Sequence, residues 1–294
     1  MSFRFLLPLL LALPAAALAS TPINETRPLD PDGRVEISNL KGTIQVRTWD
    51  KPQVRITGSL GRGVEKLEIG AGGSELEIKV RYPRRSSDRS ERTDLMVDVP
   101  TLASLDIDGV AVDISVVGTA GRELEIDSVS GDVTVAGAPR KADIESVSGE
   151  LNLTLNSAEV EAQSVSGNVI LRGRLNGDVR AETVSGNIHV NSRDERVRRL
   201  DSTTVSGNAN LQVGLRDGGE IKAESVSGNI KVVTPRALSA NVHGESFSGH
   251  LRAPGATIDK PRFGPGSSFE HRYGDGSGEI HLETFSGSVE LLLQ

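Results

Sequence analysis

Apolar and polar residues alternate in short segments of the chain, and the pattern returns about every twenty residues. A tetrapeptide of the form Ser/Thr-Val/Phe-Ser-Gly marks each return. Its glycines are Gly131, Gly149, Gly167, Gly186, Gly207, Gly228, Gly249 and Gly287. They are 18, 18, 19, 21, 21, 21 and 38 residues apart, so the last unit is degenerate or carries an insertion. This period is typical of a β-solenoid coil, because helical repeats need about 33 residues or more and propeller blades about 40.

Each unit contains two short strands. Apolar residues stand seven and five positions before the glycine, with mostly charged residues between them, which is the alternation of a half-buried strand. Apolar residues after the glycine have the opposite parity, which predicts a bulge or corner between the strands. We place the change of parity at the Ser-Val step, so the Val or Phe of each tetrapeptide is predicted to point inward. These residues are Val129, Val147, Val165, Val184, Val205, Val226, Phe247 and Phe285.

The tetrapeptide is interpreted as the structural corner of a coil. Glycine allows a close backbone approach that a Cβ would obstruct, and serine can hydrogen-bond nearby backbone. A serine repeated in register is more typical of a stacking ladder than of catalysis, since a nucleophile needs one serine with its base and an orienting group. An asparagine follows four of the glycines and predicts a ladder of side-chain amides. These asparagines are Asn168, Asn187, Asn208 and Asn229.

The repeats predict an all-β fold, a single elongated β-solenoid of roughly ten coils built from 18–21-residue units. Residues 20–294 form one domain, because no linker composition divides them. Within it we expect atypical coils at 20–108, regular repeats at 109–253, and an excursion with the last coil at 254–294. Coils about 4.8 Å apart would make a rod near 50 Å long.

The first 19 residues have the pattern of a bacterial Sec-type signal peptide. A basic Arg4 precedes an apolar run, and small residues stand before a cleavage point after Ala19. The mature protein is therefore expected to be periplasmic or extracellular, and no integral membrane segment is expected after cleavage.

Composition narrows the chemistry. The chain has no cysteine, which excludes disulfides and thiolate ligands, and its nine aromatic residues predict a narrow aliphatic core. A formal net charge of -7 argues against nucleic acid as a partner. The five histidines have no recognisable metal-ligand spacing, although His243 and His281 fall at equivalent outward positions, so we expect neither a metal site nor a cofactor.

Acidic residues on the outward positions of the first strand form the most suggestive surface. We expect neighbours on successive coils to be about 5 Å apart. A solvated acidic stripe is the favoured interpretation, and a face that binds a cation such as Ca²⁺ or a partner is the alternative. Paired carboxylates could also cleave a polysaccharide, but few aromatics are available to stack on sugars. The candidate residues are Glu125, Asp127, Asp143, Glu145, Glu159 and Glu161.

A basic connector stands out against the acidic background. It carries Arg193, Arg196, Arg198 and Arg199. The simplest interpretation is a solvated loop, and the alternative is a site for an anionic envelope polymer or an acidic partner.

Three stretches carry a resemblance to a known family. They are the SVSG and TVSG units from Ser128 to Gly287, the segment NLKGTIQV at Asn39 to Val46, and the ending GDGSGEIHLETFSGSVEL. They resemble the bacterial "putative adhesin" family that carries domain of unknown function 4097, over nearly the whole mature chain. The resemblance implies a secreted envelope protein with a right-handed, parallel β-helix-like fold, no assigned enzymatic activity and no catalytic residues.

Two classes of function follow. The first is a non-catalytic structural scaffold or adhesin-like interaction module, whose partner is an unknown envelope protein or polysaccharide, or another copy that pairs through open strand edges at the solenoid ends. The alternative is a carbohydrate-active β-helix, a polysaccharide hydrolase or lyase. The lack of an aromatic-lined acidic cleft in the sequence favours the first class.

Overall fold

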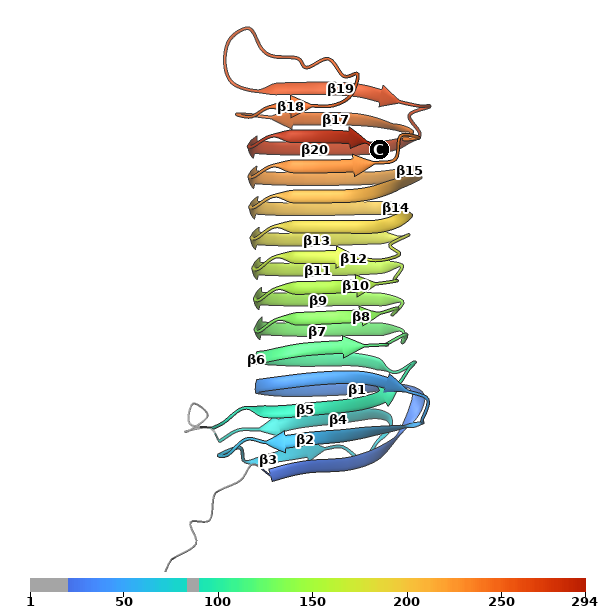
Figure 1. Cartoon of the computed structure of the whole chain (residues 1–294), viewed down its shortest axis with the longest axis vertical. Helices are drawn as coiled ribbons and strands as arrows, with labels where there is room; N and C mark the ends of the chain where they lie inside the picture. The colour runs from blue at the N-terminus through green and yellow to red at the C-terminus, as the bar shows by residue number, and fades with distance from the viewer. Residues whose placement is uncertain (1–20, 84–89) are drawn as a thin grey trace, which may run out of the picture.

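The structure, a computed structural model, describes residues 21–83 and 90–294. Every regular element in these ranges is a β-strand, so the all-β prediction is confirmed (Figure 1). The predicted signal peptide lies outside the described residues. No helix in the described part of the chain has the length and hydropathy to cross a bilayer.

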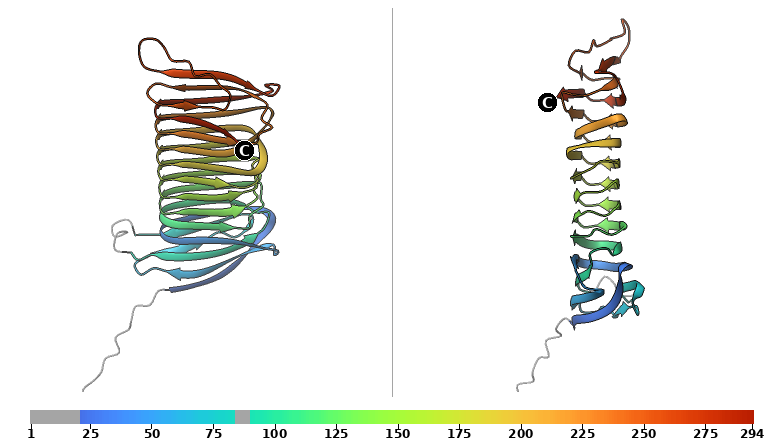
Figure 2. Two further views of the ribbon diagram at one scale, coloured as in Figure 1. Left: turned by 45° about the horizontal axis from the view of Figure 1, so that its top comes forward. Right: turned by 90° about the vertical axis from the view of Figure 1, so that its right-hand side faces the viewer.

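Most strands belong to two walls that face each other across a thin core (Figure 2). Each repeat contributes one strand to the first wall, turns at its glycine, and contributes a shorter strand to the second wall. The first wall contains the start of β6 (Ser104–Val117), β7 (Glu123–Ser130), β9 (Lys141–Ser148), β11 (Glu159–Ser166), β13 (Asp178–Ser185), the ends of β14 (Ile188–Ser206) and β15 (Ala209–Ser227), β20 (Gly278–Ser286) and β17 (Ala240–Ser246). The second wall contains the end of β6, β8 (Val133–Gly137), β10 (Leu151–Leu155), β12 (Val169–Arg172), the starts of β14 and β15, β16 (Ile230–Thr234), β21 (Val289–Leu293) and β18 (Leu251–Arg252).

Equivalent residues of successive repeats pair in parallel register. Leu124 pairs with Ala142, which pairs with Val160, and on the second wall Val133 pairs with Leu151. The side chains in these columns are buried between the walls. The core is therefore narrow and mainly aliphatic, as the composition predicts.

The valine or phenylalanine of the tetrapeptide points outward, which contradicts the sequence prediction. Its exposed fraction is 45% at Val205 and 56% at Phe285, and the other members lie between these values. The Ser or Thr before it is the buried residue instead, with 4% exposure at Thr183. In five of the eight coils this hydroxyl donates to the glycine carbonyl of a stacked coil, as Thr183 Oγ1 does to Gly167 O at 3.2 Å. The change of parity thus occurs at the Ser-Gly step, because a small hydroxyl residue fits the corner of the core and also satisfies a backbone acceptor.

The glycines are corner residues, as predicted, and the reason is close stacking of the coils. A Cβ on Gly149 would lie 2.1 Å from the carbonyl oxygen of Gly131, and one on Gly228 would lie 1.8 Å from that of Gly207. The asparagine ladder is confirmed as well. Asn208 Nδ2 donates to Asn187 Oδ1 at 3.1 Å, and Asn229 Nδ2 donates to Asn208 Oδ1 at 3.0 Å.

Both ends of the stack depart from chain order, and the sheet is mixed instead of wholly parallel. The second part of β1 lies between β6 and the pair β4 and β5, and β20 lies between β15 and β17. Antiparallel strands complete the ends, since β2 pairs with β1 and β5, β3 with β4, and β19 with β17. The strands at the ends are β1 (Thr21–Trp49), β2 (Gln53–Leu60), β3 (Lys66–Ile69), β4 (Gly73–Arg81), β5 (Thr93–Pro100) and β19 (Ser267–Tyr273).

The final 38-residue spacing therefore has a specific origin. The chain forms the outermost coil at Gly249, makes the antiparallel β19, and returns to insert the Gly287 coil between the Gly228 and Gly249 coils. The coil that comes last in sequence is not last in space. The predicted excursion after residue 253 contains β19, which covers the open edge of β17.

Candidate functional site

An exposed apolar column crosses the outer surface of the first wall at right angles to its strands. The pairing of Asn39 with Gly109 and of Lys41 with Ala111 adds Leu40 and Val110 to the tetrapeptide residues. The rings of Phe247 and Phe285 stack with centroids 4.6 Å apart. We call this set the apolar column, which in spatial order is Leu40, Val110, Val129, Val147, Val165, Val184, Val205, Val226, Phe285 and Phe247.

A parallel column of mainly acidic residues stands two positions earlier on the same strands. Alternation along a strand places both columns on the outer face. We call this second set the acidic column, which consists of Asp108, Asp127, Glu145, Gln163, Glu182, Thr203, Glu224, Glu283 and Glu245. The two columns make the first wall amphipathic across its width.

The two columns line a groove of about 1180 Å³ that extends from Asn39 to Val205. At its N-terminal end β3 and β4 contribute Lys66 and Lys79, and Tyr82 borders the groove beside Asn39. The Tyr82 hydroxyl donates to Asn39 Oδ1 at 2.8 Å, which fixes this end. A smaller hollow of about 390 Å³ lies over Phe285 and Phe247 at the opposite end of the apolar column.

Three buried serines also line the groove. They are Ser128, Ser146 and Ser164, the first residues of their tetrapeptides. Their hydroxyls have no hydrogen-bond partner within the described residues, whereas the equivalent Thr183 and Ser246 bond to a stacked glycine carbonyl. The N-terminal half of the groove is therefore the part with unsatisfied polar atoms beneath it.

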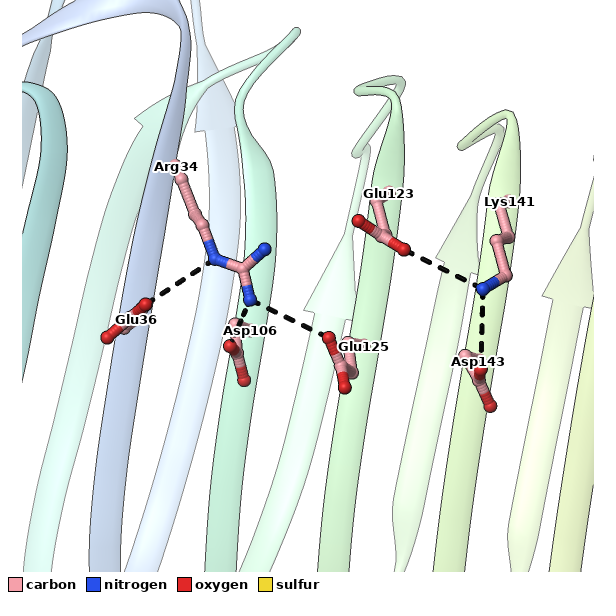
Figure 3. A network of polar contacts seen from close by, with 7 residues as sticks. All are labelled: Arg34, Glu36, Asp106, Glu123, Glu125, Lys141 and Asp143. Carbon is pink, nitrogen blue, oxygen red and sulfur yellow. Dashed lines mark hydrogen bonds and ion pairs between the residues drawn. The ribbon is translucent and has the colours of Figure 1, made fainter.

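The six acidic residues predicted as a face lie together on the first wall, in three neighbouring columns. Glu125, Asp143 and Glu161 share one column, in which each carboxylate faces a cation. Arg34 lies 3.6 Å from Glu125, and Lys141 lies 3.6 Å from Asp143 (Figure 3). Arg180 lies 3.9 Å from Glu161. Each of these three carboxylates thus has a cation close by, and each cation is shared, Arg34 with Asp106 and Lys141 with Glu123.

The other predicted residues have different surroundings. Glu159 pairs in register with Lys141 and Asp178 in the third column. Asp127 and Glu145 belong to the acidic column and border the groove. Within the described residues neither carboxylate has an ion-pair partner, and neither does the neighbouring Asp108. Negative charge is thus concentrated along the N-terminal half of the groove.

The electrostatics of this part of the groove follow from that arrangement. Burial raises the pKa of Asp127 above its ordinary value, and the Asp108, Asp106 and Asp143 carboxylates raise it further. Burial likewise raises the pKa of Glu145, with Asp127 as the next largest cause. Burial and the nearby Asp106 raise the pKa of Asp108, while Lys79 opposes them. These carboxylates would gain free energy from a cation brought into the groove.

One group of side chains has the geometry to hold a metal ion, among the residues that the structure describes. Glu224, His281 and Glu283 offer ligand atoms within 4.8 Å of one another. His243 stacks on His281 at a centroid distance of 5.0 Å, as their equivalent positions predict. The Lys222 ammonium lies 2.8 Å from Glu224 Oε1 and would compete with an ion for that carboxylate. The sequence reasoning did not predict this group, because its members belong to different repeats with no local ligand spacing.

The four arginines of the basic connector lie in β14, at the edge of the coils opposite the glycine corners. Arg198 forms an ion pair with Asp178, and Arg199 lies 3.4 Å from Glu220. Arg193 has a φ of 46° in the turn, and Arg196 pairs in register with Gly214. Two of the four guanidinium groups are therefore already matched by acidic residues of the same chain.

The apolar column is the candidate binding surface that the sequence did not lead us to predict. The reason is that the sequence prediction placed the change of parity at the Ser-Val step, two residues before the Ser-Gly step where it occurs. A signal was available, since the first Ser or Thr of each tetrapeptide has the same parity as the two inward columns before it. Continuing that alternation would have placed the next residue outside.

Solved structures share this architecture at low sequence identity. A "putative adhesin" from Parabacteroides distasonis is 14% identical with a TM-score of 0.52, and the match covers 93% of this chain and 98% of that one. A "putative lipid binding protein" from the same species is 13% identical with a TM-score of 0.52, covering 92% and 97%. A "putative adhesin" from Bacteroides fragilis is 13% identical with a TM-score of 0.44, covering 93% and 98%. A search of curated proteins gives no match.

At these identities the two Parabacteroides distasonis structures show a common fold and no more. The sequence itself carries the stronger assignment, because the model of the Toastrack DUF4097 family matches residues 32–217, which is more than half of the chain. The chain belongs to the Toastrack DUF4097 family.

Proposed function

We propose that this protein is a non-catalytic binding module of the bacterial cell envelope, an elongated β-solenoid that holds a partner in the groove of its first wall. The apolar column carries the proposal. Contiguous apolar surface on a soluble protein marks an interaction site, whereas isolated exposed apolar residues do not. Here the exposed side chains follow one another on paired strands along the whole stack.

The proposed location is the periplasm or the cell exterior. The pattern of residues 1–19 and the adhesin names of structural neighbours support it. An adhesin-like role fits a stiff stack of coils, because its groove has a fixed shape and presents an exposed apolar side chain at every step. One neighbour is named for lipid binding, and an apolar surface of this kind is also compatible with an apolar ligand.

The carbohydrate-active alternative, a polysaccharide hydrolase or lyase, gains no specific support. Its sugar would need aromatic side chains to stack on beside a carboxylate pair. Among the described residues that border the groove between Asn39 and Val205, the exposed apolar surface comes from leucine and valine side chains, and Tyr82 is the one aromatic residue. We therefore do not propose it.

Site-specific photocrosslinking in cells tests the proposed function. The crosslinking residue replaces Val165 on the apolar column of the full chain, and Thr134 on the outer face of the second wall is the matched control. Both side chains are exposed, so neither replacement disturbs the core. We expect one dominant adduct from position 165 and none from 134. Adducts that are the same at both positions, or absent from both, would contradict the proposal.

A further inference from the structure

We propose that the partner of the groove is an amphipathic α-helix with a line of Lys or Arg residues along one border of its apolar side, lying across the strands on the apolar column. This inference rests on the proposed function and adds the chemical class of the partner. Backbone hydrogen bonding, charge and length support it.

The backbone of the partner must satisfy its own hydrogen bonds. The strands of the first wall that carry the groove are paired on both sides, so they offer no free edge to an extended peptide. An extended chain lying across them would press unpaired amide groups against valine side chains, which is costly. An α-helix pairs its own amides internally and presents only side chains. A helix is thus the form of polypeptide that can cover the apolar column.

The charge of the partner follows from the acidic column. Asp108, Asp127 and Glu145 border the N-terminal half of the groove without an ion-pair partner in the described residues. The neutral Gln163 follows in the column, and the next carboxylate, Glu182, lies 3.9 Å from Arg180. Basic side chains beside the apolar side of a helix would meet these carboxylates while its apolar residues cover the valines. A second copy of this chain would bring another acidic column, and an anionic lipid surface would be repelled.

The length of the helix follows from the spacing of the strands. Seven members of the apolar column, from Leu40 to Val205, border the main groove. Their six intervals of about 4.8 Å span about 29 Å. A helix rises about 1.5 Å per residue, so about 19 residues cover this distance. Lys66 and Lys79 close the groove beyond Leu40, where they lie close to Glu68 and Glu77 of the same chain.

Fluorescence anisotropy with model peptides tests this inference on the mature full chain. The probe is an 18-residue helix of Lys and Leu with one apolar side. One control peptide has the same composition in an order that spreads Leu around the helix, and another has Glu in place of Lys. We expect the first peptide to bind at least about tenfold more tightly than either control, with an affinity that falls as salt is added.

Variants assign the binding to the groove. Asp127→Asn with Glu145→Gln should weaken the Lys/Leu peptide by about tenfold and reduce the salt dependence, without moving the melting temperature downward. Val147→Thr with Val165→Thr should also weaken it, whereas Thr134→Val on the second wall should leave it unchanged. Circular dichroism confirms that each variant is folded.

The inference would be overturned if the Lys/Leu peptide did not bind, if all three peptides bound equally, or if the carboxylate variants left the affinity for the peptide unchanged. It would also be overturned if the protein bound phosphatidylglycerol vesicles more tightly than the peptide, or if the free protein formed a dimer that the valine variants abolish. The crosslinking result at Val165 is independent of all of them. A specific adduct there without peptide binding would keep the proposed function and reject the helix.

Discussion

The replacement Gly228→Ala measures how tightly the coils stack at their corners. The new Cβ would lie 1.8 Å from the carbonyl oxygen of Gly207 and 2.6 Å from its carbonyl carbon. An ordinary contact needs about 3.4 Å, so the two backbones must separate by about 3.4 - 1.8 = 1.6 Å. Both atoms belong to the backbone, and a rotamer change therefore cannot relieve the clash.

That separation breaks hydrogen bonds between the two coils. Gly207 N donates to Ser227 O at 3.1 Å, Ala209 N donates to Asn229 O at 2.9 Å, and Asn229 N donates to Asn208 Oδ1 at 3.0 Å. Stretching each of them by more than 1 Å removes it. At about 1 kcal/mol for each bond, the loss is about 3 kcal/mol, a large fraction of the 5–15 kcal/mol that is typical for a whole domain.

Thermal unfolding followed by far-UV circular dichroism is the assay, with Gly218→Ala as the matched control. A Cβ at Gly218 meets nothing within 4 Å, so its cost is that of a φ of +70° for alanine, about 1 kcal/mol. We expect Gly228→Ala to lower the melting temperature by at least about 6 °C, and by clearly more than the control does. Equal shifts for the two variants would refute the close-stacking explanation of the repeated glycine.

Three other changes test the two walls. Asp127→Asn with Glu145→Gln should raise the melting temperature at pH 7 by about 1–3 °C. The pKa values of Asp127 and Glu145 are raised in the folded state, so their protonated forms stabilise the fold at low pH, and this stabilisation is lost as pH rises through the raised pKa values. The increase in melting temperature of the variant should therefore vanish below about pH 4. An equal increase at pH 7 and below pH 4 would contradict this explanation. In urea unfolding, Val147→Thr on the apolar column should lower the free energy of unfolding by less than about 0.5 kcal/mol, whereas Val135→Thr in the core should lower it by about 1–3 kcal/mol. A larger loss for Val147→Thr than for Val135→Thr would show that the apolar column is buried. Asn208→Ala removes the bond to Asn187 and the acceptor for Asn229, and a loss below about 0.5 kcal/mol in the same assay would show that the amide ladder contributes little.

The fold could be predicted from the sequence to the extent that it is local and repeated. The period, the two inward columns, the glycine corner and the asparagine ladder all recur at fixed offsets, so each unit supports the interpretation of the others. The ends could not be predicted in this way. The insertion of β20 between β15 and β17 depends on which open edge a returning strand pairs with, and no offset in the sequence encodes that choice.

Part of the candidate site could be predicted from the repeats, and part of it could not. The acidic residues were predicted on successive coils, and the parallel register from Glu125 to Asp143 and Glu161 confirms it. The ion pair of Glu125 with Arg34 could not be predicted, because β1 and β7 are far apart in the sequence and approach only through the out-of-order coil at the N-terminal end. The apolar column was not predicted, because we assigned its valines to the core as apolar residues. The strict alternation of side chains along the strand would have placed them outside.

The position of the apolar column bears on whether copies of the protein would associate through it. Apolar surface is hazardous mainly at an unpaired strand edge, where a second chain can add its backbone. Here the column lies on the face of paired strands, and the edge of β17 is covered by the antiparallel β19. Another copy that approached the column would bring its own Asp127 and Glu145 toward the same carboxylates. The acidic column therefore disfavours pairing with a like-charged copy and favours a basic partner, so the surface can be apolar along its length and still discriminate between partners by charge.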